Sequence, residues 1–317
     1  MMVKSIDDKI QKAFEFVLSN RNDDGMWYNF LTRNHGESAD WVSSFIGLNL
    51  LDSGIEQKEL KATAQSILKR QRNNGGFSYN HKIVPDADST AFAIRFLSHF
   101  GYETEIDMAK NFLKEHQHIN GGFRTYQEQS IRKYERILSE MSVEGWCSPT
   151  PDITASALLA NLNNEFAIQF LLNTQQENGS WRSYWWTSDV YATTHSLEAL
   201  SKLGYNNQVE KANEWLAQDN NVPDVAFYLS LSIRTLVRNK KYRGITKSRI
   251  ERLLSSQNED GSWDTIPILQ FPLPSNSQPW YDSKRWREDA RDQNKIFTTS
   301  SCIKALSEYR RNTLYVD

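Results

Sequence analysis

The chain contains five copies of one short turn, and this repetition constrains its fold more than any other feature. Each copy has an acidic or amide residue, then Gly, then Gly, Ser or Met, then an aromatic ring. Four copies are preceded at a fixed distance by a glutamine. Such a repeated unit is typical of stacked helical repeats, in which each unit buries its apolar face against the next. The copies are Asp24–Trp27, Asn74–Phe77, Asn120–Phe123, Asn178–Trp181 and Asp260–Trp263, and the glutamines are Gln71, Gln117, Gln175 and Gln257.

Two kinds of helix are predicted to alternate between these turns. One kind is amphipathic with its charges on one face, and the other is apolar nearly all round, so that it must be buried. Alternating half-exposed and buried helices close most economically into two concentric rings. We therefore predict an all-α fold, an (α/α) toroid with the apolar helices inside. The amphipathic segments are Glu56–Arg70, Glu103–His116, Asn164–Thr174, Gln208–Gln218 and Lys247–Ser256, and the apolar ones are Trp41–Leu51, Ser89–Phe100, Ile153–Leu162, Tyr191–Leu203, Val225–Val237 and Thr298–Tyr309.

The ends of these helices carry recognisable signals. The Gly of each turn is expected to take the left-handed position after an outer helix, with the ring packed over the turn. Carboxylates or hydroxyls are predicted to cap the inner helices. The N-termini of the inner helices, with their positive dipole ends, would then gather at one mouth of the ring. The predicted caps are Asp40, Asp88, Asp152, Asp189 and Thr298.

The bulk properties exclude several classes of protein. All 317 residues are expected to form one toroid domain, residues 1–317, because no Ser/Gly/Pro-rich linker separates the repeats. A net charge of −2 with 24% charged residues argues against a nucleic-acid partner. Two cysteines cannot build a disulfide framework, and no His/Cys cluster has zinc spacing. The N-terminal amphipathic helix is too acidic for a signal peptide, and no segment is long enough to span a bilayer. We expect a cytoplasmic protein; its oligomeric state is left open.

Three segments carry a resemblance to a known family. Asp86-Ala87-Asp88-Ser89-Thr90-Ala91 resembles the DxDD-T-A motif of the squalene-hopene cyclase and class II terpene cyclase superfamily, and the DxDTT variant more closely. The segments 149–155 and 179–193 resemble its P-S-x-D-V-T-A and G-S-W…Y-G-T segments, and the repeated turns resemble its QW-type repeats. The similarity is to the main catalytic barrel, the β domain, and covers about residues 20 to 310.

The resemblance implies that Asp88 is the catalytic acid. Class II cyclisation starts by protonating an alkene, which needs a carboxylic acid that burial keeps protonated where no water competes. The family's acid is the middle Asp of the motif, Asp88 here, with Asp86 as its partner and Ser89 as a hydrogen-bonding neighbour. The residues by themselves leave open that Asp88 only caps its helix and that Asp86 is a solvated turn residue.

One position departs from the family pattern. In the squalene cyclases a His sits four residues after the Asp of D-V-T-A, where it enhances the acid. Here Asp152 is followed at that distance by Ser156. A serine can donate a hydrogen bond but cannot carry positive charge. Either the acid is weaker, or another group polarises it, or the activity has drifted.

Aromatic rings near the acid are candidates to bind substrate, because aromatic faces stabilise carbocations. Packing within the turn is the alternative role for the ring of Trp181. His195 is a candidate terminal base or a wall of the pocket. The candidate substrate-binding residues on the barrel are Trp41, Asp152, Ser156, Trp181, Trp185, Tyr191, His195 and Phe227.

A polar head group would need separate partners. Lys284, Arg285 and Arg287 lie in a long loop beside aromatic rings and are candidates to bind a diphosphate, although a solvated charge run is the alternative. Glu37 and Asp40 are candidate ligands for Mg²⁺ bound to such a diphosphate, and their spacing also arises by chance. This diphosphate-bound Mg²⁺ is the cofactor that the resemblance allows; no metal site built from protein ligands alone is predicted.

The function predicted from this pattern is class II cyclisation of a linear isoprenoid, either farnesyl or geranylgeranyl diphosphate. Two alternatives stay open. A protein prenyltransferase-like subunit shares the toroid but needs an Asp, a Cys two residues later and a distant His, and the sequence has no Asp-x-Cys. A non-catalytic or diverged toroid that binds an isoprenoid or a protein partner would explain Ser156.

Overall fold

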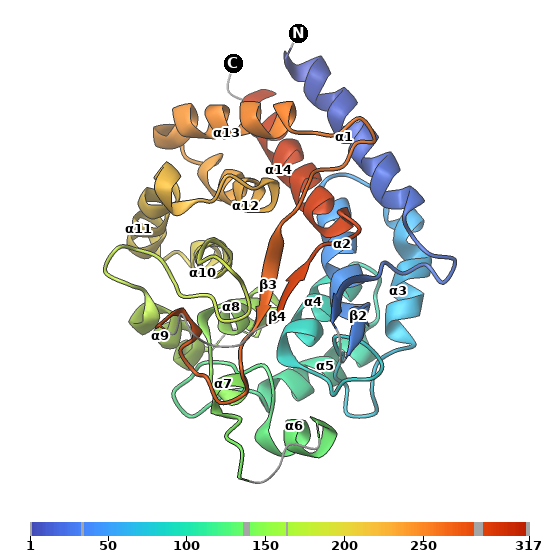
Figure 1. Cartoon of the computed structure of the whole chain (residues 1–317), viewed down its shortest axis with the longest axis vertical. Helices are drawn as coiled ribbons and strands as arrows, with labels where there is room; N and C mark the ends of the chain where they lie inside the picture. Colours follow the sequence, from blue (N-terminus) through green and yellow to red (C-terminus); the bar gives the residue numbers. More distant parts are fainter. Residues whose placement is uncertain (1, 33–34, 136–139, 163, 282–287, 315–317) are drawn as a thin grey trace.

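Six buried helices form a closed inner ring in this computed structural model, which describes residues 2–32, 35–135, 140–162, 164–281 and 288–314. Each helix contacts the next, and the last contacts the first (Figure 1). Ile94, Leu158 and Leu197, which the toroid prediction placed inside, are only 3%, 4% and 5% exposed. The inner helices are α2 (Asp40–Asp52), α4 (Ala87–Leu97), α8 (Pro151–Leu159), α10 (Val190–Lys202), α12 (Ala226–Leu236) and α14 (Ile296–Leu314).

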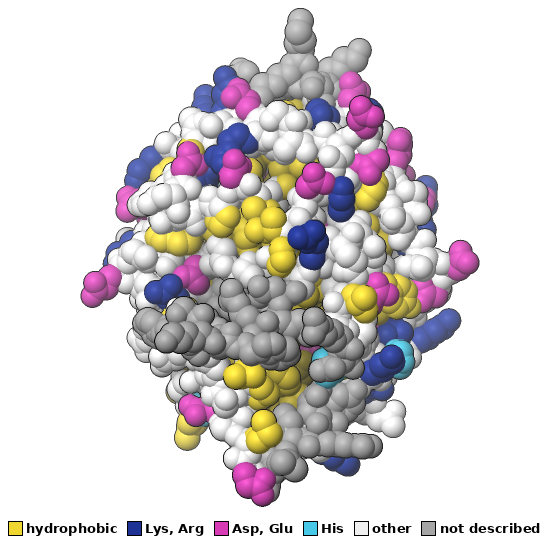
Figure 2. Space-filling model, in the orientation of Figure 1, with side chains coloured by type: hydrophobic (Ala, Val, Ile, Leu, Met, Phe, Trp, Pro, Cys, Tyr) yellow, Lys and Arg dark blue, Asp and Glu magenta, His cyan; other side chains and the backbone are white. Residues whose placement is uncertain are grey.

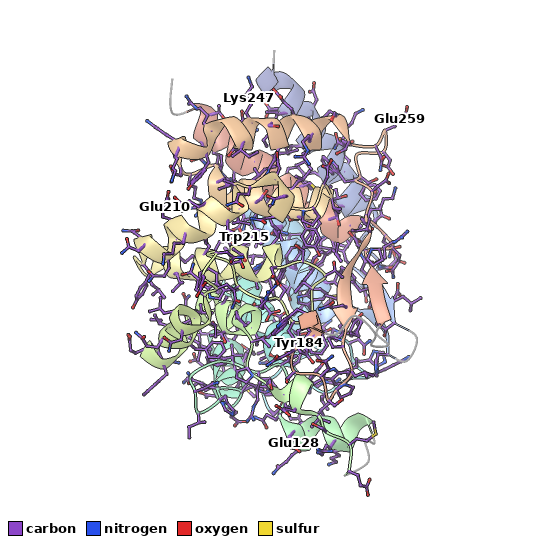
Figure 3. The ribbon with its side chains drawn as sticks, turned by 60° about the vertical axis from the view of Figure 1, so that its left-hand side comes forward. Glu128, Tyr184, Glu210, Trp215, Lys247 and Glu259 are labelled. Carbon is purple, nitrogen blue, oxygen red and sulfur yellow. The ribbon has the colours of Figure 1, made fainter. Side chains whose placement is uncertain are left out.

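An outer helix packs against each inner one, which confirms the all-α toroid. In Figure 3 the charged side chains of Glu128, Glu210, Lys247 and Glu259 lie at the periphery, whereas Tyr184 lies inside. The N-terminal helix belongs to this outer layer, because it packs on α14 and brings the two ends of the chain together. The outer helices are α1 (Met2–Ser19), α3 (Lys61–Leu68), α5 (Glu103–Lys114), α9 (Glu165–Thr174), α11 (Asn206–Leu216) and α13 (Arg243–Ser255).

In the four repeats that have it, the glutamine joins its turn to the next outer helix. Its side-chain amide donates one hydrogen bond to the carbonyl of the turn glycine and a second to an oxygen of the following outer-helix segment. The last copy closes the ring, since Gln257 Nε2 donates to Gly261 O and to Lys9 O, both at 2.9 Å. The repeated glutamine is therefore a clamp between neighbouring repeats.

The aromatic residue of each turn is tied to an inner helix through its backbone. In all five copies its N–H donates to a Ser or Thr hydroxyl near the start of that helix. One of these bonds runs from Phe77 N to Thr90 Oγ1 at 2.9 Å, two residues beyond Asp88. The repeated turn thus fixes where five of the six inner helices begin, all except α12. The five pairs are Trp27–Ser43, Phe77–Thr90, Phe123–Thr154, Trp181–Thr193 and Trp263–Thr299.

Four of the five predicted helix caps are wrong. Asp86 caps α4, and its carboxylate accepts from Ser89 N at 2.7 Å, so Asp88 lies one residue inside the helix. The helices α2, α8 and α14 likewise begin at or before the residue predicted to cap them. Asp189 is the N-cap of α10, although its carboxylate accepts from Ser183 N instead of from the helix. The prediction failed because a carboxylate at a helix start has the same signature at the cap and in the first turn.

Two antiparallel hairpins and several short helices were not predicted. β1 (Asn29–Thr32) pairs with β2 (Gly36–Ser38), and β3 (Pro267–Phe271) pairs with β4 (Glu288–Arg291). β3 also pairs with the chain that precedes α10, through Gln270 N to Trp185 O at 2.8 Å and Thr187 N to Ile268 O at 3.0 Å. The short helices are α6 (Glu128–Glu135), α7 (Glu144–Cys147), η1 (Gln57–Leu60), η2 (Asp219–Asn221), η3 (Lys240–Tyr242) and η4 (Pro279–Tyr281).

The surface carries charges of both signs. Figure 2 shows Lys and Arg side chains interspersed with Asp and Glu over the face in view, without a patch of one sign. Within the described residues no helix has the length and apolar character needed to cross a bilayer.

Replacing the turn glycine of the third repeat tests the packing of turns on outer helices. Gly121 has φ +93° and its backbone lies against Phe166 of α9, so that a Cβ would clash with the carbonyl of Phe166. Gly101 has φ +77° with open space around it and serves as the control. We expect Gly101→Ala to cost about 1–2 kcal/mol of unfolding free energy, and Gly121→Ala a further ~1–3 kcal/mol. Urea unfolding followed by circular dichroism measures both; equal losses would contradict this packing.

Candidate active site

A cavity of about 60 Å³ lies where the N-terminal ends of the inner helices meet the strand β3. Asp88 and Asp86 form part of its wall, and the rest is mostly aromatic. The strand β3 supplies Leu269 and Phe271. The remaining lining residues are Trp41, Tyr79, Ser89, Thr125, Tyr126, Trp185 and Trp186.

Asp86 is held in place by three hydrogen bonds. Its carboxylate accepts from Ser89 N and Ser89 Oγ, both at 2.7 Å, and from Tyr79 N at 3.1 Å. Burial raises the pKa of Asp86 to about 7, and the bonds from Ser89 oppose that rise. The Ser89 hydroxyl therefore serves Asp86, whereas the resemblance had suggested it as a neighbour of the acid itself. Asp86 is a buried cap, not a solvated turn residue.

Asp88 opens onto the cavity. Its Oδ1 atom is buried and has no hydrogen-bond partner. Burial raises the pKa of Asp88 to about 8; the nearby Ser156 hydroxyl lowers it, and the charges of Asp86 and Asp152 raise it. Asp88 is therefore protonated at neutral pH, because the low-polarity surroundings disfavour the carboxylate form.

Two other polar groups near Asp88 lack partners. Ser156 Oγ and the Tyr191 hydroxyl are buried and make no hydrogen bond, although both lie close enough to interact electrostatically with Asp88. Asp152, by contrast, is fully engaged, since it accepts from Thr150 Oγ1, Ile153 N and Tyr184 N. Asp152 is thus a structural carboxylate next to the acid. Ser156 and Tyr191 therefore remain available to interact with Asp88.

The upper wall of the cavity is a group of aromatic rings. Trp185 Nε1 donates to Thr125 Oγ1 at 2.8 Å, and its ring meets those of Tyr126 and Phe271 edge to face, at 6.3 and 6.1 Å between centroids. Trp41 meets Trp186 edge to face at 5.8 Å. Trp41 and Trp185, which were both predicted to bind substrate, therefore line the same cavity as Asp88.

A continuous aromatic stack lies deeper in the ring, below the cavity. Trp186 stacks on Tyr191 at 3.7 Å and on Phe227 at 5.3 Å, and Tyr191 stacks on His195 at 4.1 Å. His195 Nδ1 lies 3.0 Å from the carbonyl of Tyr191, so Nδ1 carries the ring proton. Burial lowers the pKa of His195 to about 3, which makes it neutral. Tyr191, His195 and Phe227 line the barrel, but they do not border the cavity.

Trp181 lies away from the inner ring, and three predicted residues lie outside the described residues. Trp181 is fully buried in the outer turn, where Nε1 donates to Leu171 O at 2.8 Å, so its ring packs within the repeat and does not face the cavity. This is the alternative that the turn pattern offered for Trp181. The loop residues Lys284, Arg285 and Arg287 fall outside the described part of the chain.

Sequence reasoning missed part of the cavity wall. Tyr79, Thr125 and Tyr126 follow the second and third turns by two or three residues, so the repeat could have located them. Leu269 and Phe271 come from β3, whose short apolar run is bounded by Pro267 and Pro272. Such a run is a signal for a short strand, but nothing in the sequence says that this strand covers the cavity.

The candidate Mg²⁺ pair does not converge on an open site. Asp40 is 1% exposed and forms an ion pair with Arg70. Glu37 Oε1 accepts instead from Gln293 Nε2 at 3.2 Å. Among the described residues no group of three or more His, Cys, Asp and Glu side chains could hold a metal ion. A Mg²⁺ ion carried by a diphosphate stays a prediction.

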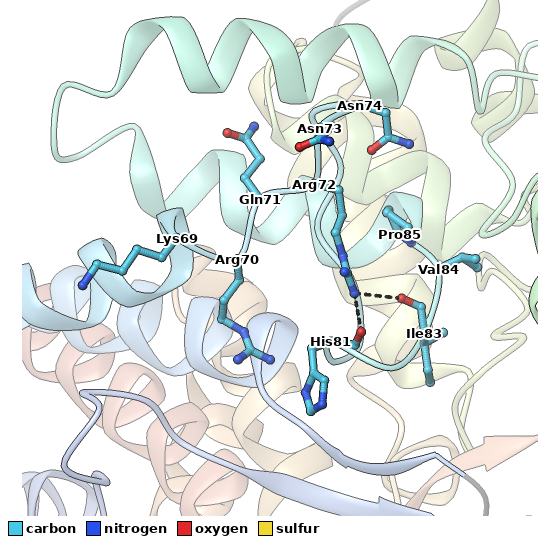
Figure 4. A pocket seen from close by; sticks show the side chains of 10 residues that line it. All are labelled: Lys69, Arg70, Gln71, Arg72, Asn73, Asn74, His81, Ile83, Val84 and Pro85. Carbon is cyan, nitrogen blue, oxygen red and sulfur yellow. Dashed lines mark hydrogen bonds between the residues drawn. The ribbon is translucent and has the colours of Figure 1, made fainter.

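A second and larger hollow, of about 760 Å³, is separate from the cavity of Asp88. Residues 69–74 and 81–85 contribute to it, and Figure 4 shows Arg72 reaching from the turn to the loop opposite. Arg72 Nη2 donates to the carbonyls of His81 and Ile83, at 2.6 and 3.4 Å. Arg72 thus holds the outer side of the loop whose inner side presents Tyr79 and Asp86 to the cavity.

Comparison with known proteins relates the chain to two families of similar fold. The profile of the squalene-hopene cyclase C-terminal domain matches residues 76–226, and that of the prenyltransferase alpha-alpha toroid domain matches residues 9–139. A squalene-hopene cyclase from Bradyrhizobium diazoefficiens is 25% identical over an alignment of 261 residues that covers 68% of this chain and 39% of that protein. The chain therefore spans well under half the length of that relative.

Solved structures show the same fold over the full chain. The type II terpene cyclase MstE from Scytonema, in complex with geranylgeranyl dihydroxybenzoate, superposes with a TM-score of 0.87 at 24% identity over 98% of both chains. A second structure of MstE, in complex with merosterolic acid A, gives a TM-score of 0.89 at 24% identity over 98% of both chains.

The raised pKa of Asp88 predicts a pH-dependent effect of Asp88→Asn on stability. The folded protein holds the Asp88 proton up to about pH 8, whereas the unfolded chain releases it near pH 4. Wild-type stability should therefore fall between these values by up to ~1.4 kcal/mol per pH unit through this group. The Asp88→Asn variant lacks this loss. Its free energy of unfolding in urea, relative to that of the wild type, should therefore increase from pH 5 to pH 8. Parallel pH profiles for the two proteins would show that Asp88 is not a buried acid.

Proposed function

We propose that this chain, a class II terpene cyclase-like domain, cyclises a linear isoprenoid by protonating a terminal alkene from Asp88. The observation that carries the proposal is a protonated carboxyl group in the wall of an aromatic-lined cavity. Farnesyl and geranylgeranyl diphosphate are the proposed substrates. The structural neighbour that binds geranylgeranyl dihydroxybenzoate supports a linear isoprenoid chain as the class of substrate.

The reaction needs only one proton from the protein to begin. The alkene takes the proton of Asp88 at its less substituted carbon, which leaves a carboxylate and a tertiary cation. The next alkene donates its π electrons to that cation and closes a ring. Loss of a proton at the end restores neutrality, so the product is an isomer that keeps any head group. General acid catalysis of this kind contributes typically 10²–10⁴-fold to a rate.

The cavity wall suits a cation. Trp41, Trp185 and Phe271 present ring faces or edges near Asp88, and aromatic faces attract a positive charge without attacking it. The cavity of about 60 Å³ is far smaller than any linear isoprenoid. Substrate entry therefore requires side chains of the wall, or the strand β3, to move aside.

The experiment compares three substrates in wild type and variants. Purified protein is incubated with farnesyl diphosphate, geranylgeranyl diphosphate and squalene, and the products are identified by mass spectrometry and NMR. We expect a cyclic isomer from a diphosphate and no detectable turnover in Asp88→Asn, because an amide of equal shape cannot protonate an alkene. Asp189→Asn is the matched control, since Asp189 caps the equivalent helix of another repeat without lining the cavity.

Three outcomes separate the candidate functions. Full activity in a folded Asp88→Asn protein would contradict the cyclase mechanism. If the wild type binds isoprenoids without turnover, the protein is better described as a diverged, non-catalytic toroid, the alternative that Ser156 suggests. Transfer of the prenyl group to a peptide, with release of diphosphate, would point to a prenyltransferase.

The pH dependence of kcat/KM gives a second test of the same acid. Asp88 acts in its protonated form, and its pKa is raised to about 8 by burial. The rate should therefore be level from about pH 6 to pH 7 and fall tenfold per pH unit well above pH 8. A rate that rises with pH through this range would mean that the essential group is a base.

A further inference from the structure

We propose that Arg95 supplies the positive charge that strengthens the acid Asp88, in place of the histidine that Ser156 replaces. This inference rests on the proposed function and adds a positioning residue to it. It follows from the place of Arg95 on α4, from the contacts of its guanidinium and from the balance of charge inside the ring.

Arg95 lies on the same face of α4 as Asp88. Positions Asp88, Phe92 and Arg95 are spaced by four and three residues, which places them one above the other along one side of a helix. The guanidinium of Arg95 lies over the ring of Phe92, 5.1 Å from its centroid. Phe92 in turn contacts His195 on α10 and Phe45 on α2. Arg95 therefore points into the ring of helices, below the acid and separated from it by aromatic rings.

The charge of Arg95 is not cancelled by a close carboxylate. Its Nη1 atom is buried and has no hydrogen-bond partner. Nearby carboxylates are paired with other cations, Glu198 with Arg234 at 2.7 Å and Asp52 with Lys304 at 2.5 Å. Within the described residues no carboxylate lies within ion-pair distance of Arg95. These two pairs are neutral as units, so the charge of Arg95 is the one left over at this end of the barrel.

The other groups around the acid do not provide a cation. Asp86 precedes α4, and Asp152 and Ser156 face it from α8. From α10 it meets Tyr191, whose hydroxyl is neutral because burial raises its pKa well above the usual value. His195, one turn further along α10, is kept neutral by burial. Arg95 is the cation whose field acts on Asp88, and it favours the ionised form of that carboxyl.

The size of the effect follows from the geometry. Seven residues of helix place Arg95 about 10 Å from Asp88 along the axis. A unit charge at about 10 Å with an effective dielectric near 20 shifts a pKa by about one unit. The buried ring of Phe92 lies against the guanidinium on the face of α4 that carries Asp88, and buried charges are screened little by counter-ions. A lower acid pKa means easier proton release to the alkene, as the reaction requires.

The test removes the charge and keeps the unbranched start of the side chain. In Arg95→Gln and Arg95→Met, the alkaline limb of the kcat/KM profile should shift to higher pH by about one unit. In the same variants, kcat at about pH 6 to pH 7, where the profile is level, should fall several-fold. Arg95→Lys keeps the charge and should restore both. Arg238→Met is the control, because Arg238 is a 60% exposed cation in the turn after α12 and pairs with Glu308. Its profile should match that of the wild type. A folded Arg95→Gln protein with the wild-type alkaline limb would overturn the inference.

A readout without turnover separates this inference from the proposed function. The pKa of Asp88 is measured from the pH dependence of unfolding free energy with and without Asp88→Asn, in both the wild-type and the Arg95→Gln backgrounds. We expect the Asp88 pKa to be about one unit higher without Arg95, whether or not the protein turns over a given substrate. An unchanged pKa would overturn the role of Arg95, while an absence of product from wild type would bear only on the proposed function.

Discussion

The position of the acid depends on one hydrogen bond that the fold repeats five times, between the backbone of a turn and a hydroxyl on an inner helix. In the second repeat this bond joins Phe77 N to Thr90 Oγ1. Thr90 Oγ1 also donates to the carbonyl of Asp86, so one hydroxyl links the turn, the cap and the helix. Asp88 lies between those two residues. The same arrangement that closes the toroid therefore also sets where the acid faces.

A carboxyl group that protonates an alkene must satisfy two opposed demands. It must keep its proton until the substrate arrives, which burial achieves by raising the pKa. It must also release that proton to a very weak base, which needs a low pKa. Different groups meet the two demands. The aromatic rings beside Asp88 exclude water and raise its pKa, whereas the charge of Arg95, further along α4, lowers it. Asp86 does not share this role, because its carboxylate already accepts hydrogen bonds from Ser89 Oγ and Tyr79 N.

Repetition made the fold predictable. The turns recur with glycine and an aromatic ring at fixed places, so sequence alone indicated both rings of helices and placed Asp88 at the start of an inner helix. The glutamine clamp and the Ser/Thr hydroxyls use the same repeat, although only the structure shows what they bind.

Features that occur once were harder to predict. The strand β3 covers the cavity because of contacts with the chain before α10, which lies more than 80 residues away in sequence. The helix caps were misplaced because neighbouring carboxylates share one signature. Arg95 was overlooked because a single cation on an apolar helix suggests a side chain that reaches outward. Its role depends on which carboxylates are already paired, and pairing across the ring is a property of tertiary structure.

The most direct test of the central claim, that Asp88 gives its proton to an alkene, is to run the reaction in D₂O and locate deuterium in the product by NMR and mass spectrometry. Exchange loads Asp88 with deuterium before each turnover. The account predicts one deuterium per product molecule, bound to the ring carbon that was the less substituted carbon of the terminal alkene, with the head group retained. A cyclic product without deuterium at that carbon, or with the head group lost, would contradict it.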